Sequence, residues 1–184
     1  MFKPIIAALI GVVALVPNGA SGQDNPRNRE GFWISFGFGA GSLGSGNSCT
    51  SQFCPESLRE TGAVAYLRMG GTVSQHALLG VESSGWARVD ENGEVSQFGA
   101  LSLVGFYYPS VSGGFFLRGG VGTANHARND DRRSGLGLSI GLGIDLKAGN
   151  TFSFTPFANL IHGRFSNPDI RRNLLQLGLG FSWS

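Results

Sequence analysis

Residues 136–146 read LGLSIGLGIDL, and every second residue in this stretch is leucine or isoleucine. The residues between them are glycine, serine and a single aspartate. A period of two predicts a β-strand with two different faces. In a water-soluble sheet the second face would carry bulky solvated side chains. Here it is nearly bare, which predicts large side chains facing lipid and small ones filling a narrow interior.

The same alternation recurs along the chain and predicts an all-β fold, a transmembrane up-and-down antiparallel β-barrel of about eight strands over residues 31–184. The expected strands lie near residues 32–39, 61–72, 77–88, 95–108, 114–123, 136–146, 151–162 and 175–183. Most are close to the roughly 9–11 residues that a tilted strand needs to cross a bilayer. With about eight strands, side chains fill the interior and leave no aqueous pore.

The expected connections alternate between long and short. Long loops are expected at residues 41–59, 89–94, 124–133 and 163–170, and short turns at 73–75, 109–113 and 148–150. This asymmetry predicts extracellular loops and periplasmic turns, and an even strand number places both termini in the periplasm. Pro156 has no N–H to donate, so we expect a break or bulge in its strand.

The composition agrees with a barrel. Charged residues make up only 14% of the chain and glycine accounts for 30 of its 184 residues, whereas soluble domains average about 25% charged and about 7% glycine. After the N-terminal segment, no apolar run is long enough for a transmembrane helix. The formal charge of +2 does not indicate a nucleic-acid partner.

The N-terminus predicts a secretory signal peptide over residues 1–22. Lys3 precedes an apolar run at residues 5–16, and small residues lead to an expected cleavage after Gly22. The apolar run is too short to span a bilayer as a helix. Residues 23–30 are polar and are expected to form a flexible periplasmic N-terminal segment.

The C-terminal run LQLGLGFSWS resembles the last strand of bacterial outer-membrane β-barrels, and the chain from residue 31 resembles the small, porin-like members of that class. The resemblance implies that Phe181 and Trp183 form the signal read by the barrel-assembly machinery, although Trp183 is penultimate rather than last. It also implies a place in the outer membrane, in contact with its lipid and lipopolysaccharide. It implies no particular activity, and no cofactor is expected.

Cys49 and Cys54 lie in the first expected loop. Two cysteines in an exported protein favour a disulfide. The alternative, a metal site, has only half of a ligand set because no histidine lies near. We therefore expect no metal.

His162 and Ser166 precede the last strand in the run IHGRFSNPDI. They faintly resemble the outer-membrane lipid A deacylases, whose histidine and serine are separated by one residue rather than three. The resemblance implies a histidine general base and a serine nucleophile, with Asp169 as the nearest carboxylate to orient the ring. The alternative, which we favour, is a polar strand rim that ends in a turn.

Two polar sets complete the analysis. The candidate interior set is Arg68, Glu82, Arg118, Asp145, Asn159 and Gln176. It is either a hydrogen-bonded plug, the favoured reading, or a narrow ion path, and Arg68 is expected to pair with Glu82 because unpaired buried charges are costly. The loop set could bind lipopolysaccharide phosphates or simply be solvated: Arg128, Arg132, Arg133, Arg164, Arg171 and Arg172.

The sequence thus leads to three functional hypotheses. The first is a non-enzymatic outer-membrane protein with a structural or surface-interaction role through its extracellular loops. The second is a membrane-embedded lipid hydrolase centred on His162 and Ser166. The third is a narrow pore.

Overall fold

The computed structural model describes residues 29–47, 59–128, 131–149, 151–166 and 169–183. The described residues form strands joined by turns. No helix among them is long and apolar enough to cross a membrane.

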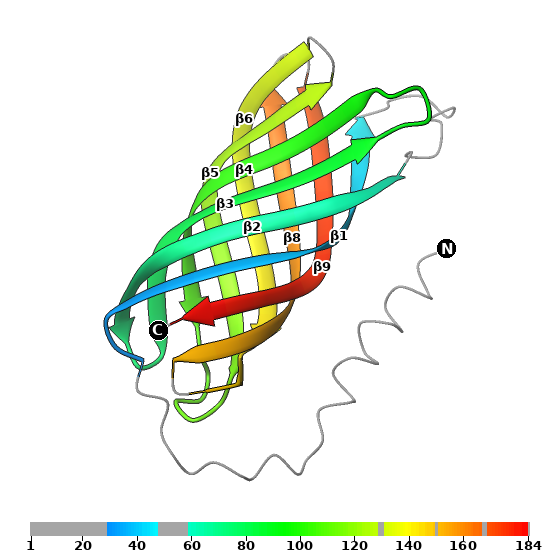
Figure 1. The fold of residues 1–184 in the computed structure, drawn as a ribbon. Helices are drawn as coiled ribbons and strands as arrows, with labels where there is room; N and C mark the ends of the chain where they lie inside the picture. Colours follow the sequence, from blue (N-terminus) through cyan, green and yellow to red (C-terminus); the bar gives the residue numbers. More distant parts are fainter. Residues whose placement is uncertain (1–28, 48–58, 129–130, 150, 167–168, 184) are drawn as a thin grey trace, which may run out of the picture.

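The described strands form one closed antiparallel barrel of eight long strands and one short one (Figure 1). Neighbours in sequence are neighbours in the wall, β1 pairs with β9, and β6 pairs with β8 to close the ring. Closure matters because an open sheet edge leaves backbone groups unpaired. The strands are β1 (Phe32–Asn47), β2 (Arg59–Ser74), β3 (Ala77–Val89), β4 (Val95–Tyr107), β5 (Phe115–Arg128), β6 (Asp131–Ile144), β7 (Leu146–Lys147), β8 (Phe152–Ser166) and β9 (Asp169–Trp183).

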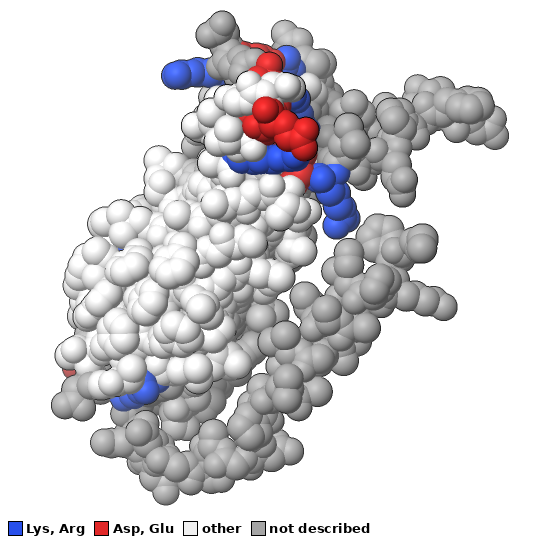
Figure 2. Space-filling view, turned by 45° about the vertical axis from the view of Figure 1, so that its right-hand side comes forward, with Lys and Arg blue, Asp and Glu red and all other residues white. Residues whose placement is uncertain are grey.

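The predicted inside–outside alternation is confirmed. On β6, Gly137 and Ser139 are buried whereas Leu136, Leu138 and Ile140 are exposed. The exposed set includes many large apolar side chains from every long strand. On the face shown in Figure 2, charged side chains gather at one end and the wall below them is almost free of charge.

The strands at the charged end are longer than predicted. The expected loop at residues 124–133 consists instead of the ends of β5 and β6, separated only by residues 129–130. The expected loop at 163–170 likewise consists of the ends of β8 and β9, and β1 continues to Asn47. The prediction failed because the outward-facing residues of these extensions are polar or small, so the outer face no longer shows an apolar strand pattern, although Leu43, Phe165 and Ile170 still contribute to the interior cluster.

Pro156 does not break or bulge its own strand, so that prediction was wrong. β8 runs through Pro156 and keeps its register with β9. The interruption falls on the other neighbour: β6 ends at Ile144 and β7 begins at Leu146 in the same register against β8. The gap lies opposite Pro156, in agreement with its missing backbone donor.

Two apolar clusters fill the interior at different heights. The larger cluster lies toward the charged end and comprises Leu43, Val64, Trp86, Phe98, Ala100, Ala124, Ile161, Phe165 and Leu174. The other lies toward the end with the short turns and comprises Trp33, Leu78, Val104, Phe106, Tyr108 and Phe116. The interior is therefore packed with side chains, as expected for eight strands.

Inward glycines on β5 allow this close packing, and they generate a prediction. A Cβ atom built on Gly122 would collide with the Leu101 carbonyl oxygen of β4, whereas one built on Gly119 meets no atom within 4 Å. We expect Gly122→Ala to lower the free energy of unfolding by about 1–3 kcal/mol, because rigid backbone must move. Gly119→Ala should change it by no more than about 0.5 kcal/mol.

Urea unfolding of both variants in the same lipid vesicles provides the measurement. The two substitutions have the same effect on the entropy of the unfolded chain; Gly119 faces the outer wall, so it is the control for an alanine at a position with free space. Equal stabilities would show that the wall is not as tightly packed at Gly122 as described.

Candidate functional site: the interior charge cluster and the charged rim

A cluster of three charged side chains lies in the barrel interior. Arg68 Nε donates to Glu82 Oε2 at 2.5 Å, and Arg118 Nη2 donates to Glu82 Oε1 at 2.5 Å. The side chains of Arg68 and Glu82 are 2% and 1% exposed, and that of Arg118 is fully buried. The strand register explains the meeting, since Arg68 and Glu82 are cross-strand partners on β2 and β3. The predicted pair is confirmed, and Arg118 joins it.

Neighbouring groups hold the two arginines in place. The Arg68 guanidinium lies over the Tyr66 ring, 3.7 Å from its centroid, where the ring face stabilises a cation. Arg118 Nη2 also donates to Ser139 Oγ at 3.1 Å. When the Asn159 amide is oriented so that its nitrogen donates to the Ala158 carbonyl, its oxygen accepts from Arg68 Nη2 at 3.2 Å. The cluster is therefore a hydrogen-bonded plug, with two positive charges around one negative charge.

The remaining predicted interior residues divide between two places. Asn159 and Gln176 are both buried and are cross-strand partners on β8 and β9; in the alternative orientation of the Asn159 amide, its Nδ2 donates to Gln176 Oε1 at 3.3 Å. Asp145 lies apart from the cluster, near the end with the short turns. Its carboxylate accepts from the Tyr108 hydroxyl at 2.8 Å and from Thr155 Oγ1 at 2.7 Å.

Arg29 is a buried residue at the barrel end that sequence reasoning missed. It precedes the first strand, in a segment we expected to be flexible, yet it is only 8% exposed. Its guanidinium donates to the carbonyls of Gln75 at 3.1 Å, Val111 at 3.1 Å and Gly113 at 2.6 Å, and it stacks on Tyr108 at 3.7 Å. Arg29 thus ties the chain before β1 to two turns across the barrel mouth. No strand period extends to it, so no signal in the sequence marked it.

The histidine and serine of the hydrolase hypothesis are not brought together. Both lie on β8, which is continuous from Phe152 to Ser166. Four residues of a strand span about 13 Å, and Arg164 occupies the position between them. His162 Nδ1 lies 2.7 Å from Asn173 Oδ1. The side chains of Ser166 and Asp169 lie outside the described part of the structure, but the backbone spacing alone prevents direct proton transfer from Ser166 to His162.

The predicted loop arginines lie on the strand extensions at the charged end. Arg164 and Arg171 are direct cross-strand partners on β8 and β9, and both are exposed on the outer wall. Arg172 faces the interior side of the rim. Burial lowers its pKa, Glu60 opposes that shift, and Arg128 and Arg133 lower the pKa further.

Acidic side chains balance part of this rim charge. Arg133 donates to Asp131 at 2.7 Å and holds the pKa of that carboxyl below its usual value. Arg128 lies 3.5 Å from Glu94, with both side chains well exposed. Exposed pairs of this kind contribute little stability.

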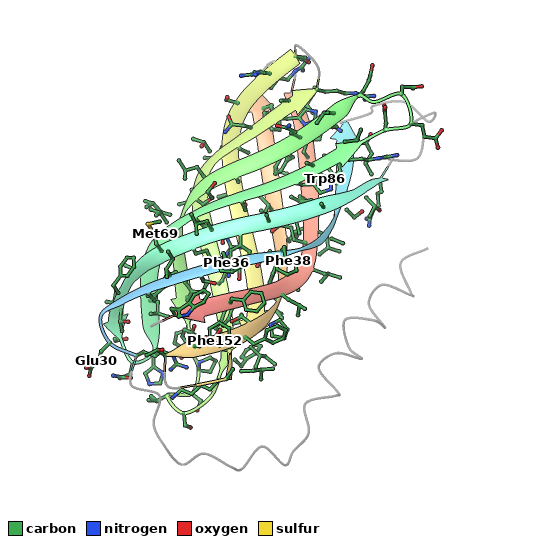
Figure 3. The ribbon with its side chains drawn as sticks, in the orientation of Figure 1. Glu30, Phe36, Phe38, Met69, Trp86 and Phe152 are labelled. Carbon is green, nitrogen blue, oxygen red and sulfur yellow. The ribbon has the colours of Figure 1, made fainter. Side chains whose placement is uncertain are left out.

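The residues of the expected assembly signal belong to an aromatic patch on the outer wall. Phe181 lies 5.4 Å from Phe36 and 5.9 Å from Phe152 between ring centroids, and Trp183 lies 5.1 Å from Phe152. Figure 3 labels Phe152 near the short-turn end and Phe36 and Phe38 farther up the wall. Cys49 and Cys54, in contrast, lie outside the described residues.

Comparison with known proteins identifies the type of fold. No protein-family model matches the chain, and no curated protein matches it in sequence. Its fold is that of small outer-membrane eight-stranded barrels. Neisserial surface protein A superposes with a TM-score of 0.61 at 10% identity, covering 83% of this chain and 96% of the other.

Two further solved structures have similar folds. The attachment invasion locus protein Ail of Yersinia pestis gives a TM-score of 0.53 at 14% identity, covering 84% of this chain and 99% of the other. OprG of Pseudomonas aeruginosa gives 0.52 at 10% identity, covering 86% and 99%. Ail has also been solved in complex with the heparin analogue sucrose octasulfate.

The charge count of the interior cluster generates a prediction. Glu82→Gln leaves two buried guanidinium groups facing a neutral amide, whereas Arg118→Gln leaves Arg68 and Glu82 as a balanced pair. We expect Glu82→Gln to lower the free energy of unfolding by about 3–5 kcal/mol, the usual result of leaving a buried charge uncompensated. Arg118→Gln should cost clearly less. Urea titrations in lipid vesicles measure both, and the reverse ranking would contradict the account.

Proposed function

We propose that the protein is a non-enzymatic barrel of the bacterial outer membrane that binds lipopolysaccharide at its charged rim. The fold supports the location, because the structures it resembles are outer-membrane proteins. The apolar outer wall supports it as well, since exposed apolar area on this scale requires lipid or another apolar partner.

The arrangement of the ends supports an orientation with the charged rim outside the cell. The short turns near Gln75, Val111 and Ala148 lie at the same end as Arg29 and Trp183. Bacterial barrels have short periplasmic turns and longer extracellular connections. We therefore assign Arg29 and Trp183 to the periplasmic side.

The observation that carries the proposal is the order of side chains up the outer wall of β8 and β9. Leu160 is paired with Leu175, His162 with Asn173, and Arg164 with Arg171. Successive outward pairs thus change from aliphatic to polar to doubly cationic. A phosphate at this level would accept hydrogen bonds from both guanidinium groups. Lipid A carries its phosphates on the sugar headgroup, to which its acyl chains are attached. Its phosphates would therefore meet the arginines while its acyl chains meet the leucines.

The charge chemistry of the guanidinium group fits this ligand. Arginine binds phosphate oxygens with two parallel hydrogen bonds, which gives geometric specificity as well as attraction. Ail, which shares the fold, has been crystallised with a polysulfated sugar. One barrel of similar fold has therefore been crystallised with a polyanionic sugar bound.

The packed interior favours this function over a pore. The apolar cluster that contains Trp86 and Phe98 fills the half of the barrel toward the rim, and the Arg68–Glu82–Arg118 cluster lies farther along the interior. The separation of His162 from Ser166 likewise argues against hydrolysis by that pair.

The binding proposal predicts an effect of the outer-wall arginines. We expect the double variant Arg164→Gln/Arg171→Gln to bind purified lipid A roughly tenfold more weakly or worse, because hydrogen bonds to charged groups are lost. The control Arg88→Gln/Arg128→Gln removes the same charge from inward-facing rim positions and should bind nearly as well as the parent. Affinity is measured by fluorescence titration of detergent-solubilised protein with lipid A at two salt concentrations.

Enzymatically dephosphorylated lipid A serves as the matched ligand. The parent protein should lose most of its affinity and its salt dependence with this ligand, and inorganic phosphate should compete weakly with intact lipid A. Equal binding of both lipids by the parent, or equal losses in the two double variants, would contradict a phosphate site on the outer wall.

A further inference from the structure

A shallow hollow lies in the outer wall where β4 pairs with β5. Gly105 and Gly119 are direct cross-strand partners there and both face outward, so the backbone is bare at this point. Leu79, Leu103 and Val121 border the hollow, whose volume is about 570 Å³. For scale, a cavity of about 150 Å³ binds benzene. The hollow therefore has room for aromatic side chains from another surface.

The packing of the barrel does not account for the bare glycine pair. A Cβ atom built on Gly119 meets no described atom within 4 Å, and one built on Gly105 reaches the Leu79 side chain at 3.4 Å, which is ordinary contact. Larger residues would therefore fit at both positions, and glycine weakens a strand. A glycine inside a strand often marks a place where another surface approaches the backbone closely.

The aromatic patch of the outer wall faces in the opposite direction. Phe181 on β9 packs against Phe36 on β1 and Phe154 on β8, with ring centroids 5.4 and 5.6 Å apart. Phe36, Phe38 and Trp183 are 43%, 55% and 39% exposed. In the ring of long strands, the boundary between β9 and β1 is four strands from the boundary between β4 and β5 in either direction. The aromatic patch and the hollow thus lie on opposite sides of the barrel.

The aromatic patch and the hollow also lie at the same depth in the membrane. Following cross-strand partners from Phe36 through β2, β3 and β4 leads to Thr123 on β5. Following them the other way, through β9, β8 and β7, leads to Gly113, just before β5. The two routes have equal numbers of steps and the strands of a barrel share one tilt, so the β5 residue at the height of Phe36 lies midway, at Arg118. The next outward residue is Gly119.

This match in depth identifies an occupant for the hollow. All copies insert with the same end outward, so only surfaces at equal depth can meet. We propose that the hollow of one copy receives the aromatic patch of a second copy, which produces head-to-tail rows in the plane of the membrane. Because the two surfaces face opposite directions, the contact does not close on a pair of copies and continues from one copy to the next.

The energetics of a bilayer favour a second copy over a lipid chain. Association in lipid is driven by close packing, and small residues allow backbones to approach. The rings of the aromatic patch already hold one another in place, so they lose little freedom on entering the hollow, whereas a flexible acyl chain would have to be ordered. This contact lies within the apolar wall and does not depend on lipid A binding at the rim.

The experiment uses the whole chain in lipid vesicles, with Cys49 and Cys54 replaced by serine and one dye-labelled cysteine at the exposed position of Asn92. Donor-labelled and acceptor-labelled copies are mixed, and energy transfer is followed as lipid is added. The parent should show transfer well above that of randomly distributed copies, and the transfer should fall in a saturable manner on dilution with lipid.

A filled hollow should prevent this association. Gly119→Leu places a side chain in the hollow and should weaken association roughly tenfold or more, because the second surface is overpacked. The matched control is Gly85→Leu, which adds the same side chain to another outward glycine of the wall with no described atom within 4 Å of its Cβ position. This control should associate as the parent does.

Mixing two variants distinguishes a head-to-tail contact from a symmetric one. Phe36→Ala/Phe181→Ala removes the centre of the aromatic patch but keeps the hollow, and alone it should not associate. Mixed with Gly119→Leu it should form pairs, because each variant keeps the surface that the other lacks.

Transfer in the parent no higher than that of random copies would overturn the proposal and leave lipid as the occupant of the hollow. Parent-like transfer in Gly119→Leu would overturn it as well, and is the result expected if two aromatic patches met each other. If the double variant does not fold, the comparison of Gly119→Leu with Gly85→Leu still decides the question. None of these results bears on lipid A binding by Arg164 and Arg171.

Discussion

The narrow interior of an eight-stranded barrel is the constraint on which the rest of this structure depends. Such a barrel encloses just enough space for the side chains of its own inner face. Bulk must therefore be placed selectively: Trp86 and Phe98 fill one half, while glycines such as Gly122 lie where a neighbouring strand leaves no room for a Cβ atom. The same limit explains why large aliphatic residues point outward along β6.

The narrow interior also restricts how its buried charged side chains can be arranged. Burying Glu82 between Arg68 and Arg118 is costly unless the geometry is good, and here each carboxylate oxygen accepts from a different guanidinium group. The three residues come from β2, β3 and β5, so the cluster links three strands across the interior. A slip of one residue in any of these strands would turn its charged side chain toward the outer wall. The cluster thus penalises wrong registers more strongly than apolar packing could.

Much of this could be predicted from the sequence, because a period of two fixes which face each residue occupies. The fold class and the pairing of Arg68 with Glu82 follow from that period and from the hairpin register. The period could not locate the strand ends beyond the apolar belt, where the outward-facing residues are polar or small. It also could not show that Pro156 would interrupt the neighbouring strand rather than its own.

Contacts that depend on closure in three dimensions were beyond the sequence. Arg29 precedes every strand, and its partners lie in two turns that are distant in the chain. The hydrolase hypothesis required the strand to continue to Ser166, so that His162 and Ser166 share a face; β8 does continue that far, but four residues of extended strand separate the two. The two ends of the barrel are distinct. One carries Arg164 and Arg171 above an apolar wall, and the other contains a small cavity whose lining includes Arg29.

The central claim is that the large residues of β6 face lipid and the small ones face a closed interior. Single cysteines at positions 136–144, each carrying a spin label in a background with Cys49 and Cys54 replaced by serine, test it most directly in lipid vesicles. Labels at Leu136, Leu138 and Ile140 should relax strongly with dissolved oxygen and weakly with a water-soluble nickel complex. Labels at Gly137 and Ser139 should perturb the fold or be shielded from both reagents. Strong relaxation by the nickel complex at the leucine positions would show that this wall faces water and would contradict the account.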